Sequence, residues 1–355
     1  MVKDIEWAEE NRLYKRRMYL TKLYNPDDIN IESKDLAYIA GLLDGEVALH
    51  ISHQKNRRSY SLGMSYTKTN YDILKYVSSV FGGKVRQVKP QAYHRFKVWQ
   101  WSIRAGNAYR VLRKLYPYLR IKHEAAAICI EFFELYLQHV QTKPVSLERQ
   151  AIGAHYMAQL QGYQSKPGSG KKYQLSQVEM KQRRITSTPP KYTKEITKPK
   201  NYFLPYVTMP ELNLAYIAGL LDAESSFIIY KLSNRPSYLL EVNYRKIDHD
   251  TLQYLADIFG GRVRLSSPST GNKPDVWLWK LVSADAYSLI KHIYPFLRVK
   301  RRTAELCIEF FELYWQGRSS KPVSPDRQAI GAKYAAMLRL YQTKSVPHRR
   351  KETET

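Results

Sequence analysis

The stretch that decides the fold is Leu36-Ala37-Tyr38-Ile39-Ala40-Gly41-Leu42-Leu43-Asp44-Gly45-Glu46, which returns almost unchanged between Leu214 and Glu224. The segment LAYIAGLLD is identical in the two copies. Each copy is typical of an apolar helix that ends in acidic residues, although the negative end of the helix macrodipole disfavours a carboxylate there by roughly 0.3–1 kcal/mol. The same unfavourable placement in both copies indicates that the acids have a use.

The two stretches belong to a duplication that extends through most of the chain. Glu46 and Glu224 lie 178 residues apart (224 − 46). The same offset relates a Phe-Gly-Gly triplet, a Trp-x-Trp pair, the segment CIEFFELY and the segment RQAIGA in the two halves. A repeat of this length is too long for a solenoid, so it predicts a duplicated domain that pairs with itself, as a fused homodimer would.

One repeat is expected to have an α+β fold with a four-stranded antiparallel sheet, in the order α-β-β-α-β-β-α-α with the last helix appended. The chain would hold two such pseudo-symmetric units in tandem, packed through the two similar helices. The segments expected in the first copy are a helix over 35–45 capped by Ser33, strands over 47–52 and 59–67, a helix over 71–81, strands over 84–89 and 96–103, helices over 107–119 and 122–140, and a last helix capped by Ser146.

Composition and punctuation divide the chain into five parts. Residues 1–32 are expected to form a basic lead-in helix, either a solvated appendage or an arm that contacts phosphate, and 33–163 the first repeat. Residues 164–210 are basic and rich in Pro, Gly and Ser, as expected of a linker that is either a solvated tether or a phosphate contact. Residues 211–342 form the second repeat and 343–355 a disordered tail.

The charge balance indicates a polyanionic partner. Lys and Arg outnumber Asp and Glu by 57 to 32, which gives a net charge of +25. A field of this size favours nucleic acid over the alternative of a merely solvated basic surface. The two cysteines, Cys129 and Cys307, occupy matching places in apolar helical runs, so we expect buried core residues and neither a disulfide framework nor a zinc site.

No membrane partner is expected. No apolar run reaches the ~18 residues of a bilayer span. The N-terminal segment MVKDIEWAEENR is too polar for a signal peptide. These features predict a soluble protein that works in the compartment where it is made.

The duplicated helix suggests a chemistry. Ala40, Gly41 and Asp44 share one helical face by their spacing, and small residues there let a second backbone approach closely. Ordinary core packing would also explain such a face, but two matched copies favour packing of the helices on each other. Glu46 and Glu224 would then meet near the pseudo-twofold axis, where their repulsion calls for a cation, most simply Mg²⁺. Acids, metal and a polyanion-binding surface suggest phosphodiester hydrolysis.

At these residues the sequence resembles the LAGLIDADG homing endonucleases of the monomeric, two-motif kind. Ile39–Val47 and Ile217–Ser225 align without gaps with the family motif, except that its last letter, usually Gly, is Val47 and Ser225 here. The segment from Tyr116 to Lys122, with its copy ending at Lys300, resembles the family segment that carries a basic active-site residue. The resemblance extends over 33–160 and 211–342.

The resemblance implies roles for individual residues. It implies two or three divalent ions, Mg²⁺ with Mn²⁺ as an accepted substitute, and Tyr66 and Tyr244 would stand where relatives often have a water-positioning Gln. The alternative for the basic residues is non-specific phosphate contact. The implied set is Glu46 and Glu224 as catalytic metal ligands, Gly45 and Ala223 beside the metal, Lys122 and Lys300 as catalytic residues that stabilise charge at the scissile phosphate, and Asp44, Asp222, Tyr66 and Tyr244 as supporting residues.

The resemblance further implies that each sheet lies as a saddle in the DNA major groove. Strand alternation then predicts which side chains face the DNA, with arginines as the strongest candidates for base contacts. The last strand of each sheet leaves both alternate sets open. The candidate side chains differ between the copies, which fits an asymmetric target or ordinary drift of solvated faces. They are His50, Ser52, Gln54, Arg57, Ser59, Ser61, Ser65, Lys84 and Arg86, with Tyr230, Glu241, Asn243, Arg245, Arg262 and Arg264.

The implied function is a site-specific homing endonuclease that hydrolyses both strands of a long asymmetric duplex in intron homing. The alternatives are an intron RNA maturase, with or without DNA cleavage, and a DNA-binding protein without cleavage, for which both acids would be dispensable. The implied partner is double-stranded DNA, or intron RNA for the maturase. The chain would act as a monomer in a chloroplast or mitochondrion if it is organelle-encoded.

Overall fold

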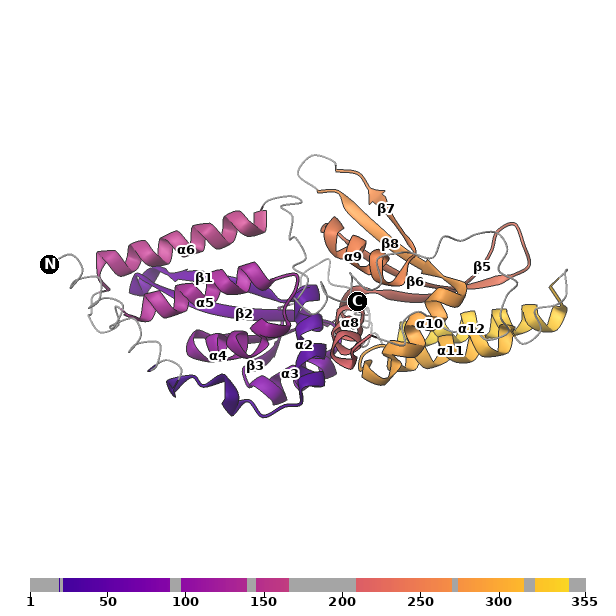
Figure 1. The fold of residues 1–355 in the computed structure, drawn as a ribbon, viewed down its shortest axis with the longest axis horizontal. Coiled ribbons are helices and arrows are strands. Elements are labelled where there is room, and N and C mark those ends of the chain that lie inside the picture. The colour runs from indigo at the N-terminus through magenta and orange to yellow at the C-terminus, as the bar shows by residue number, and fades with distance from the viewer. Residues whose placement is uncertain are drawn as a thin grey trace, which may run out of the picture. The chain divides into compact units, whose positions relative to one another are not determined.

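The computed structural model describes residue 19 and residues 22–89, 97–138, 145–165, 209–269, 274–315 and 323–344. The described chain divides into two compact units. The first contains the elements up to helix α6 together with residues 215–223 and 340–344, and the second contains residues 209–214 and the described part of 224–339. Figure 1 shows the elements of both units in chain order. Most of the predicted lead-in (1–32), linker (164–210) and tail (343–355) lies outside the described residues.

The first unit contains a four-stranded antiparallel sheet in the order β1-β2-β4-β3. Short 3-10 helices occupy Pro26–Asp28, Lys55–Arg57 and Tyr116–Tyr118. The main elements are α2 (Ser33–Glu46), β1 (Ala48–Gln54), β2 (Ser59–Lys68), α3 (Tyr71–Phe81), β3 (Lys84–Gln87), β4 (Trp99–Arg104), α4 (Ala105–Leu115), α5 (His123–Gln138) and α6 (Leu147–Ser165).

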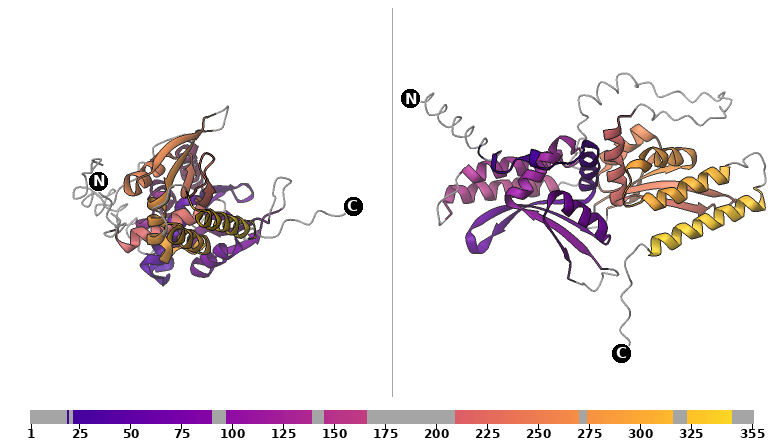
Figure 2. Two further views of the ribbon diagram at one scale, coloured as in Figure 1. Left: turned by 90° about the vertical axis from the view of Figure 1, so that its right-hand side faces the viewer. Right: turned by 90° about the horizontal axis from the view of Figure 1, so that it is seen from below.

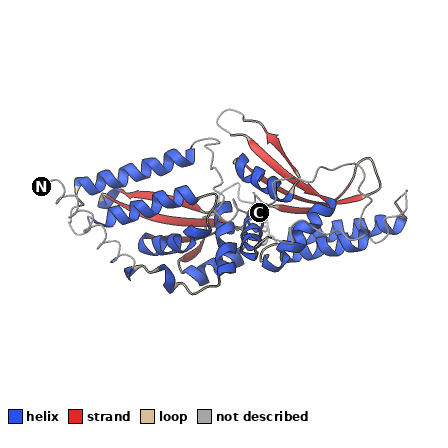
Figure 3. Cartoon of the chain, viewed as in Figure 1, coloured by secondary structure: helices blue, strands red, loops and turns tan. Residues whose placement is uncertain are grey.

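The second unit repeats this order, with strands arranged β5-β6-β8-β7 (Figure 3). A 3-10 helix at Tyr294–Phe296 matches the one at Tyr116–Tyr118. The elements of this second copy are α8 (Glu211–Glu224), β5 (Ser226–Lys231), β6 (Tyr238–Lys246), α9 (His249–Phe259), β7 (Arg262–Ser267), β8 (Val276–Val282), α10 (Ser283–Ile293), α11 (Arg301–Trp315) and α12 (Pro325–Lys344). Residues 215–223 of α8 and 340–344 of α12 belong to the first compact unit. The predicted α+β fold with two antiparallel sheets is confirmed.

Local capping explains several helix bounds. The predicted helix over 71–81 is confirmed by α3. The Asn70 side chain caps its start by accepting a hydrogen bond from Asp72 N at 3.0 Å, and the chain leaves at Gly82 with φ 73°. Ser146 caps α6 as predicted, since its Oγ accepts from Arg149 N at 3.2 Å.

Two predicted helix ends were wrong. Ser33 does not cap α2: it is the first helical residue, and Glu32 precedes it with extended backbone and no side-chain cap. The helix predicted over 107–119 ends at Leu115 and gives way to the 3-10 turn at Tyr116–Tyr118. Pro117 in that turn lacks the N–H that a longer α-helix needs.

Each sheet has one face packed in the core of its unit. In the first sheet Leu49, Ile51, Leu62 and Met64 are nearly inaccessible, and Trp101 is fully buried with its Nε1–H donated to Gly82 O at 2.7 Å. Helices of the first unit lie along this face of the sheet (Figure 2). The alternate residues form the opposite face, which we call the open face, and they are polar and partly exposed.

The cysteines and the helix lengths agree with the sequence-based expectations. Cys129 and Cys307 are free and buried, as predicted. Burial raises the pKa of the Cys129 thiol to about 12 and raises that of Cys307 as well, so both behave as core residues. Among the described helices, none combines the length and the apolar character that crossing a bilayer requires.

Candidate active site and nucleic-acid interface

Helix α2 and residues 215–223 of α8 pack backbone against backbone. A Cβ atom built on Gly41 would lie 2.0 Å from Tyr216 O, and one on Gly219 would lie 1.9 Å from Tyr38 O. Near the C-terminal ends, a Cβ on Gly45 would lie 2.5 Å from the Cβ of Ala223. Only glycine permits this approach, so the predicted packing through the two similar helices is confirmed.

Asp44 holds the loop that leads into α5. Its side chain is 2% exposed. Its carboxylate accepts hydrogen bonds from Arg120 N at 2.7 Å, Ile121 N at 3.1 Å and Lys122 N at 3.0 Å. Main-chain donors compensate the buried charge, which explains how an acid is tolerated near the negative end of a helix. The supporting role of Asp44 in a reaction site stays a prediction.

A tyrosine of each motif helix donates a hydrogen bond to the buried aspartate of the other helix. Tyr216 donates its hydroxyl hydrogen to Asp44 at 2.8 Å, and Tyr38 donates to Asp222 at 2.8 Å. The aspartates are both 2% exposed. The matched pair joins the two helices by charge-assisted hydrogen bonds, which are stronger than neutral ones.

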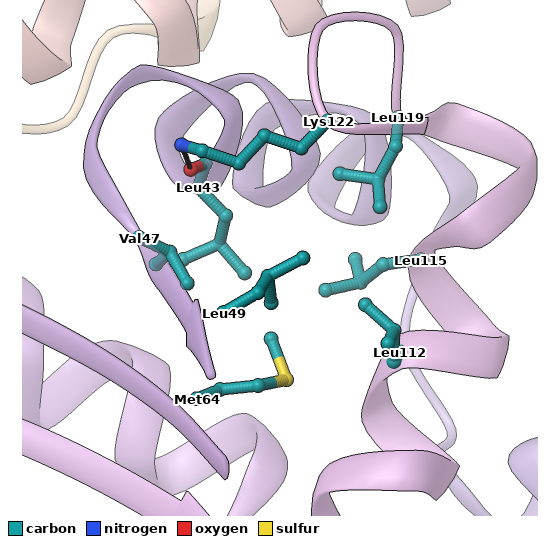
Figure 4. Close-up of a pocket in the computed structure, with 8 residues that line it drawn as sticks. All are labelled: Leu43, Val47, Leu49, Met64, Leu112, Leu115, Leu119 and Lys122. Carbon is teal, nitrogen blue, oxygen red and sulfur yellow. Dashed lines mark hydrogen bonds between the residues drawn. The ribbon is translucent and has the colours of Figure 1, made fainter. Parts of the chain in front are cut away.

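Lys122 closes the C-terminal end of α2. Its Nζ donates to Leu43 O at 2.8 Å and to Asp44 O at 2.7 Å. Figure 4 shows its aliphatic chain at the edge of a small apolar hollow, with the ammonium turned toward Leu43. An ammonium at this position offsets the negative end of the helix dipole. The hollow is lined by Leu43, Val47, Leu49, Met64, Leu112, Leu115, Leu119 and Lys122.

Lys300 takes the matching place in the second unit. It directly precedes α11, as Lys122 precedes α5. The main-chain oxygen of each lysine accepts from the amide four residues later, Ala304 N and Ala126 N, at 2.8 Å in both units. The repeat therefore preserves the local backbone at the predicted catalytic lysines.

Glu46 is the last residue of α2 and is paired with Lys68 at the end of β2. The Lys68 ammonium donates to Glu46 Oε1 and, at 2.7 Å, to the main-chain oxygen of Ala223. The side chains of Lys68 and Glu46 are 23% and 14% exposed. A cationic group thus lies between the acid of α2 and the C-terminal carbonyl of α8.

Glu224, the last residue of α8, has the equivalent partner in the second unit. Lys246 at the end of β6 lies 2.5 Å from Glu224 Oε2. The Lys246 ammonium also lies 5.7 Å from the centre of the Tyr244 ring, a cation–π contact. Tyr244 and its counterpart Tyr66 are 0% and 1% exposed.

The oxygens around Lys68 fit a hard divalent ion. The Glu46 carboxylate and the Ala223 carbonyl both face the Lys68 ammonium, so this position already accommodates a positive charge. Mg²⁺ takes one or two protein carboxylates and completes its octahedron with water and substrate phosphates. The described ranges contain no group of three or more His, Cys, Asp or Glu side chains that could hold a metal ion.

The open face of the first sheet brings most of the predicted DNA contacts together. Register pairs Ser52 with Ser61 and Gln54 with Ser59, and it aligns Lys84 with Ser102 of the last strand. Paired residues project from the same face. This decides the alternation of β4, which sequence left open. The open face carries His50, Ser52, Gln54, Ser59, Ser61, Ser65, Thr67, Lys84, Arg86, Gln100, Ser102 and Arg104, with exposed Arg57 in the turn beyond β1.

Hydrogen bonds run across this open face. Arg86 donates to Gln100 Oε1 at 3.1 Å, and Gln100 donates to Thr67 Oγ1 at 3.3 Å. His50 lies over Gly63, where an added Cβ would be 2.3 Å from its Nε2. Burial, with the charge of Arg104, lowers the pKa of His50 below 6.5.

The open face of the second sheet has a different chemistry. Glu241, which occupies the place of Gly63, is 6% exposed and lies 2.5 Å from the ammonium of Lys280. Asn243 donates to Glu241 at 3.0 Å. Tyr230 lies beside the pair, and burial together with the Glu241 charge raises its pKa. The predicted residues on this face are Tyr230, Glu241, Asn243, Arg245, Arg262 and Arg264, joined by Lys280.

Sequence reasoning missed the two lysines that contact the acids. It chose Tyr66 and Tyr244, whereas Lys68 and Lys246 lie two residues later on the same side of each strand. Both lysines keep the 178-residue offset (246 − 68). Conservation of a charge between copies whose other strand residues differ was a usable signal.

No protein-family model and no curated protein sequence matches the chain. Solved structures are similar to it. I-GzeII, a LAGLIDADG homing endonuclease in complex with its DNA target, superposes with a TM-score of 0.54 at 14% identity over 91% of this chain and 100% of that chain. I-SmaMI bound to cleaved DNA gives 0.56 at 14% identity over 89% and 98%. I-AabMI bound to uncleaved DNA gives 0.55 at 15% identity over 85% and 98%. The chain therefore has the fold of the LAGLIDADG homing endonucleases, as its paired motifs predicted.

Proposed function

We propose that this chain is a LAGLIDADG endonuclease that cuts both strands of a specific DNA duplex. One observation carries the proposal. Two helices with the same motif pack through Gly41 and Gly219, and each ends in a carboxylate, Glu46 or Glu224, that contacts a cationic side chain. An arrangement repeated to this detail is expected of paired reaction sites. Proteins of the same fold have been solved on DNA, which supports the substrate class.

Glu46 and Glu224 are proposed to hold the divalent ions, with the main chain at Gly45 and Ala223 beside them. Bound Mg²⁺ supplies a Lewis acid for the scissile phosphate and an acidified water as the nucleophile. We propose two or three ions, with Mn²⁺ as a substitute. Support for a divalent ion comes from I-SmaMI, solved on an uncleaved target in the presence of calcium ions.

The basic residues near the acids are proposed to stabilise charge. Lys122 and Lys300 follow equivalent turns, and the Lys122 ammonium lies at the last carbonyls of α2, one turn from Glu46. A fixed positive charge there favours the extra negative charge that the phosphate gains during attack. Asp44 accepts a hydrogen bond from the main-chain amide of Lys122 and so fixes the position of the Lys122 backbone.

Target recognition is proposed to use the open faces of the sheets. Exposed arginines such as Arg86, Arg262 and Arg264 suit guanine, which presents two acceptors in the major groove. Glu241 suits the amino group of cytosine. Because Gly63 and Glu241 occupy equivalent places, the two sheets read different bases, which implies a long asymmetric target. One chain carries both halves, so we propose a monomer that acts in intron homing, in an organelle if it is organelle-encoded.

Cleavage of a duplex library tests the proposal. The protein is incubated with Mg²⁺ and long random or genomic duplexes, and the cut ends are sequenced. We expect one recurrent double-strand cut that the double variant Glu46→Gln/Glu224→Gln no longer makes. A protein that cuts no duplex but binds a structured intron RNA tightly would overturn the endonuclease in favour of the maturase. Retained cutting by the double variant would overturn the roles of the acids.

A further inference from the structure

The lysines at the ends of β2 and β6 contact the same oxygen atoms that are proposed to bind metal, and the cleavage reaction alone does not require this contact. Lys68 contacts the Glu46 carboxylate and the Ala223 carbonyl, and Lys246 contacts Glu224. These are the oxygens proposed to bind metal. A lysine ammonium and a divalent ion cannot share one position, because like charges a few ångströms apart repel strongly.

We propose that Lys68 and Lys246 are built-in cations that hold the metal-binding carboxylates in the absence of metal and pass to DNA phosphate when a divalent ion binds. This inference rests on the proposed function. It assigns the two lysines a role in coupling metal binding to DNA binding. A bound metal ion frees each lysine to contact DNA phosphate, and the phosphate contact keeps the lysine away from the metal-binding oxygens. Such coupling is reciprocal by thermodynamic necessity.

Partial burial gives the carboxylates a reason to need a resident cation. The Glu46 side chain is 14% exposed and that of Glu224 is 33% exposed. A carboxylate withdrawn from water without a counter-ion is strongly disfavoured. Lysine suits a removable counter-ion, because its ammonium is a compact charge on a flexible four-carbon chain.

Repetition argues against an accidental ion pair. The two pairs come from different compact units, and in each the lysine ends the second strand of its sheet while the acid ends the motif helix. In register, Lys68 pairs with Trp99 and Lys246 with Trp277, so the two strands present the lysine at the same place. Most open-face residues nearby differ between copies, but this pair does not.

Calcium binding without DNA tests the inference directly, since it does not depend on cleavage. Ca²⁺ is titrated by calorimetry into the full-length protein, its Lys68→Met variant and a Lys75→Met control. Lys75 is an exposed residue of α3, so its replacement removes the same charge from the protein surface. We expect Lys68→Met to bind Ca²⁺ roughly fivefold more tightly than the control, the worth of one charged contact. Equal or weaker binding would overturn the inference.

Unfolding temperature separates a placeholder from a purely structural ion pair. In chelator, Lys68→Met is expected to unfold at a lower temperature than wild type, and saturating Ca²⁺ is expected to close the difference. A deficit that Ca²⁺ leaves unchanged would mean a structural pair only. Lys68→Arg keeps the positive charge on a bulkier group, so it should stay closer to wild type than Lys68→Met in both assays. If Lys68→Met fails to fold, Lys246→Met provides the same comparison at Glu224.

Salt dependence of DNA binding then tests the transfer to phosphate. On a duplex, Ca²⁺ should steepen the slope of log K against log salt by about 0.9 for each lysine that gains a phosphate contact. In Lys68→Met, Ca²⁺ should steepen this slope by about 0.9 less than in wild type. An equal steepening in both proteins would contradict the transfer of Lys68 to phosphate. A protein that binds no DNA would refute the proposed function, while the calcium titration would still decide the role of Lys68.

Discussion

A single methyl group at the α2–α8 contact provides a sharp test of the helix packing. In Gly41→Ala, the new Cβ would lie 2.0 Å from Tyr216 O and 2.9 Å from Leu220 N. Both neighbours are main-chain atoms, so no side-chain rotation relieves the clash. The two helices must move apart by roughly 1 Å or more to restore ordinary van der Waals contact.

The expected loss of stability follows from three contributions. Overpacking of a tight contact costs about 1–3 kcal/mol. Separation also lengthens the 2.8 Å hydrogen bond from Tyr216 to the buried Asp44, and a bond to a charged group contributes about 1.5–3 kcal/mol. The higher helix propensity of alanine returns about 1 kcal/mol. The net expectation is a decrease of about 1.5–5 kcal/mol in the free energy of unfolding.

Urea unfolding of Gly41→Ala measures this decrease, and the chain contains a matched control. Gly162 lies in α6, and a Cβ added there meets no atom within 4 Å. Gly162→Ala should therefore raise the free energy of unfolding by up to about 1 kcal/mol. If Gly41→Ala were as stable as wild type, or gained stability as the control does, the close helix packing would be refuted.

Further predictions concern single side chains near the site. Asp44→Asn replaces an acceptor of main-chain N–H groups by a group that is half donor, and should lower the free energy of unfolding by roughly 2–4 kcal/mol in urea titration; a loss below 1 kcal/mol would contradict the contact set. Lys122→Met keeps the apolar stem in its hollow but leaves the last carbonyls of α2 uncapped, so thermal unfolding should shift by only a few degrees while cleavage falls at least tenfold; unchanged cleavage would remove Lys122 from the reaction. Burial, with the charge of Arg104, lowers the pKa of His50 in the folded state. The contribution of neutral His50 to stability is therefore complete above pH 6.5 and is lost as the pH falls below that value. In urea unfolding measured over this pH range, His50→Gln should flatten the dependence of stability on pH, and an unchanged dependence would contradict the burial of His50.

The alternation of apolar and polar residues predicted the strands well because it is a local property of the sequence. The duplication helped because each element could be compared with its copy. Leu49 and Ile51 alternate with His50 and Ser52, and the structure buries the first pair and leaves the second partly open. The fixed offset between copies supplied a second reading of every element. Register across the sheet is a long-range property, so the open set of β4 became clear only from the pairing of Ser102 with Ser65.

The acids at the helix ends illustrate what sequence leaves out. The dipole argument identified Asp44 and Glu46 as unusual, but their compensation comes from far along the chain. The amides of Arg120, Ile121 and Lys122 reach Asp44 across 76 to 78 residues. Lys68 reaches Glu46 across 22. No spacing rule predicts such contacts, because they depend on where the α4–α5 turn and the end of β2 meet the end of α2.

Strand-resolved cleavage tests most directly the central claim, that Glu46 and Glu224 each serve one of two reaction sites. A duplex carrying the selected target, with a different label on each strand, is incubated with Mg²⁺ and wild type, Glu46→Gln or Glu224→Gln, and binding of each protein is measured in parallel. Wild type is expected to cut both strands, and each variant is expected to lose double-strand cutting, leaving at most nicks, with DNA affinity within about threefold of wild type. Double-strand cutting at the wild-type rate by either variant would contradict the account.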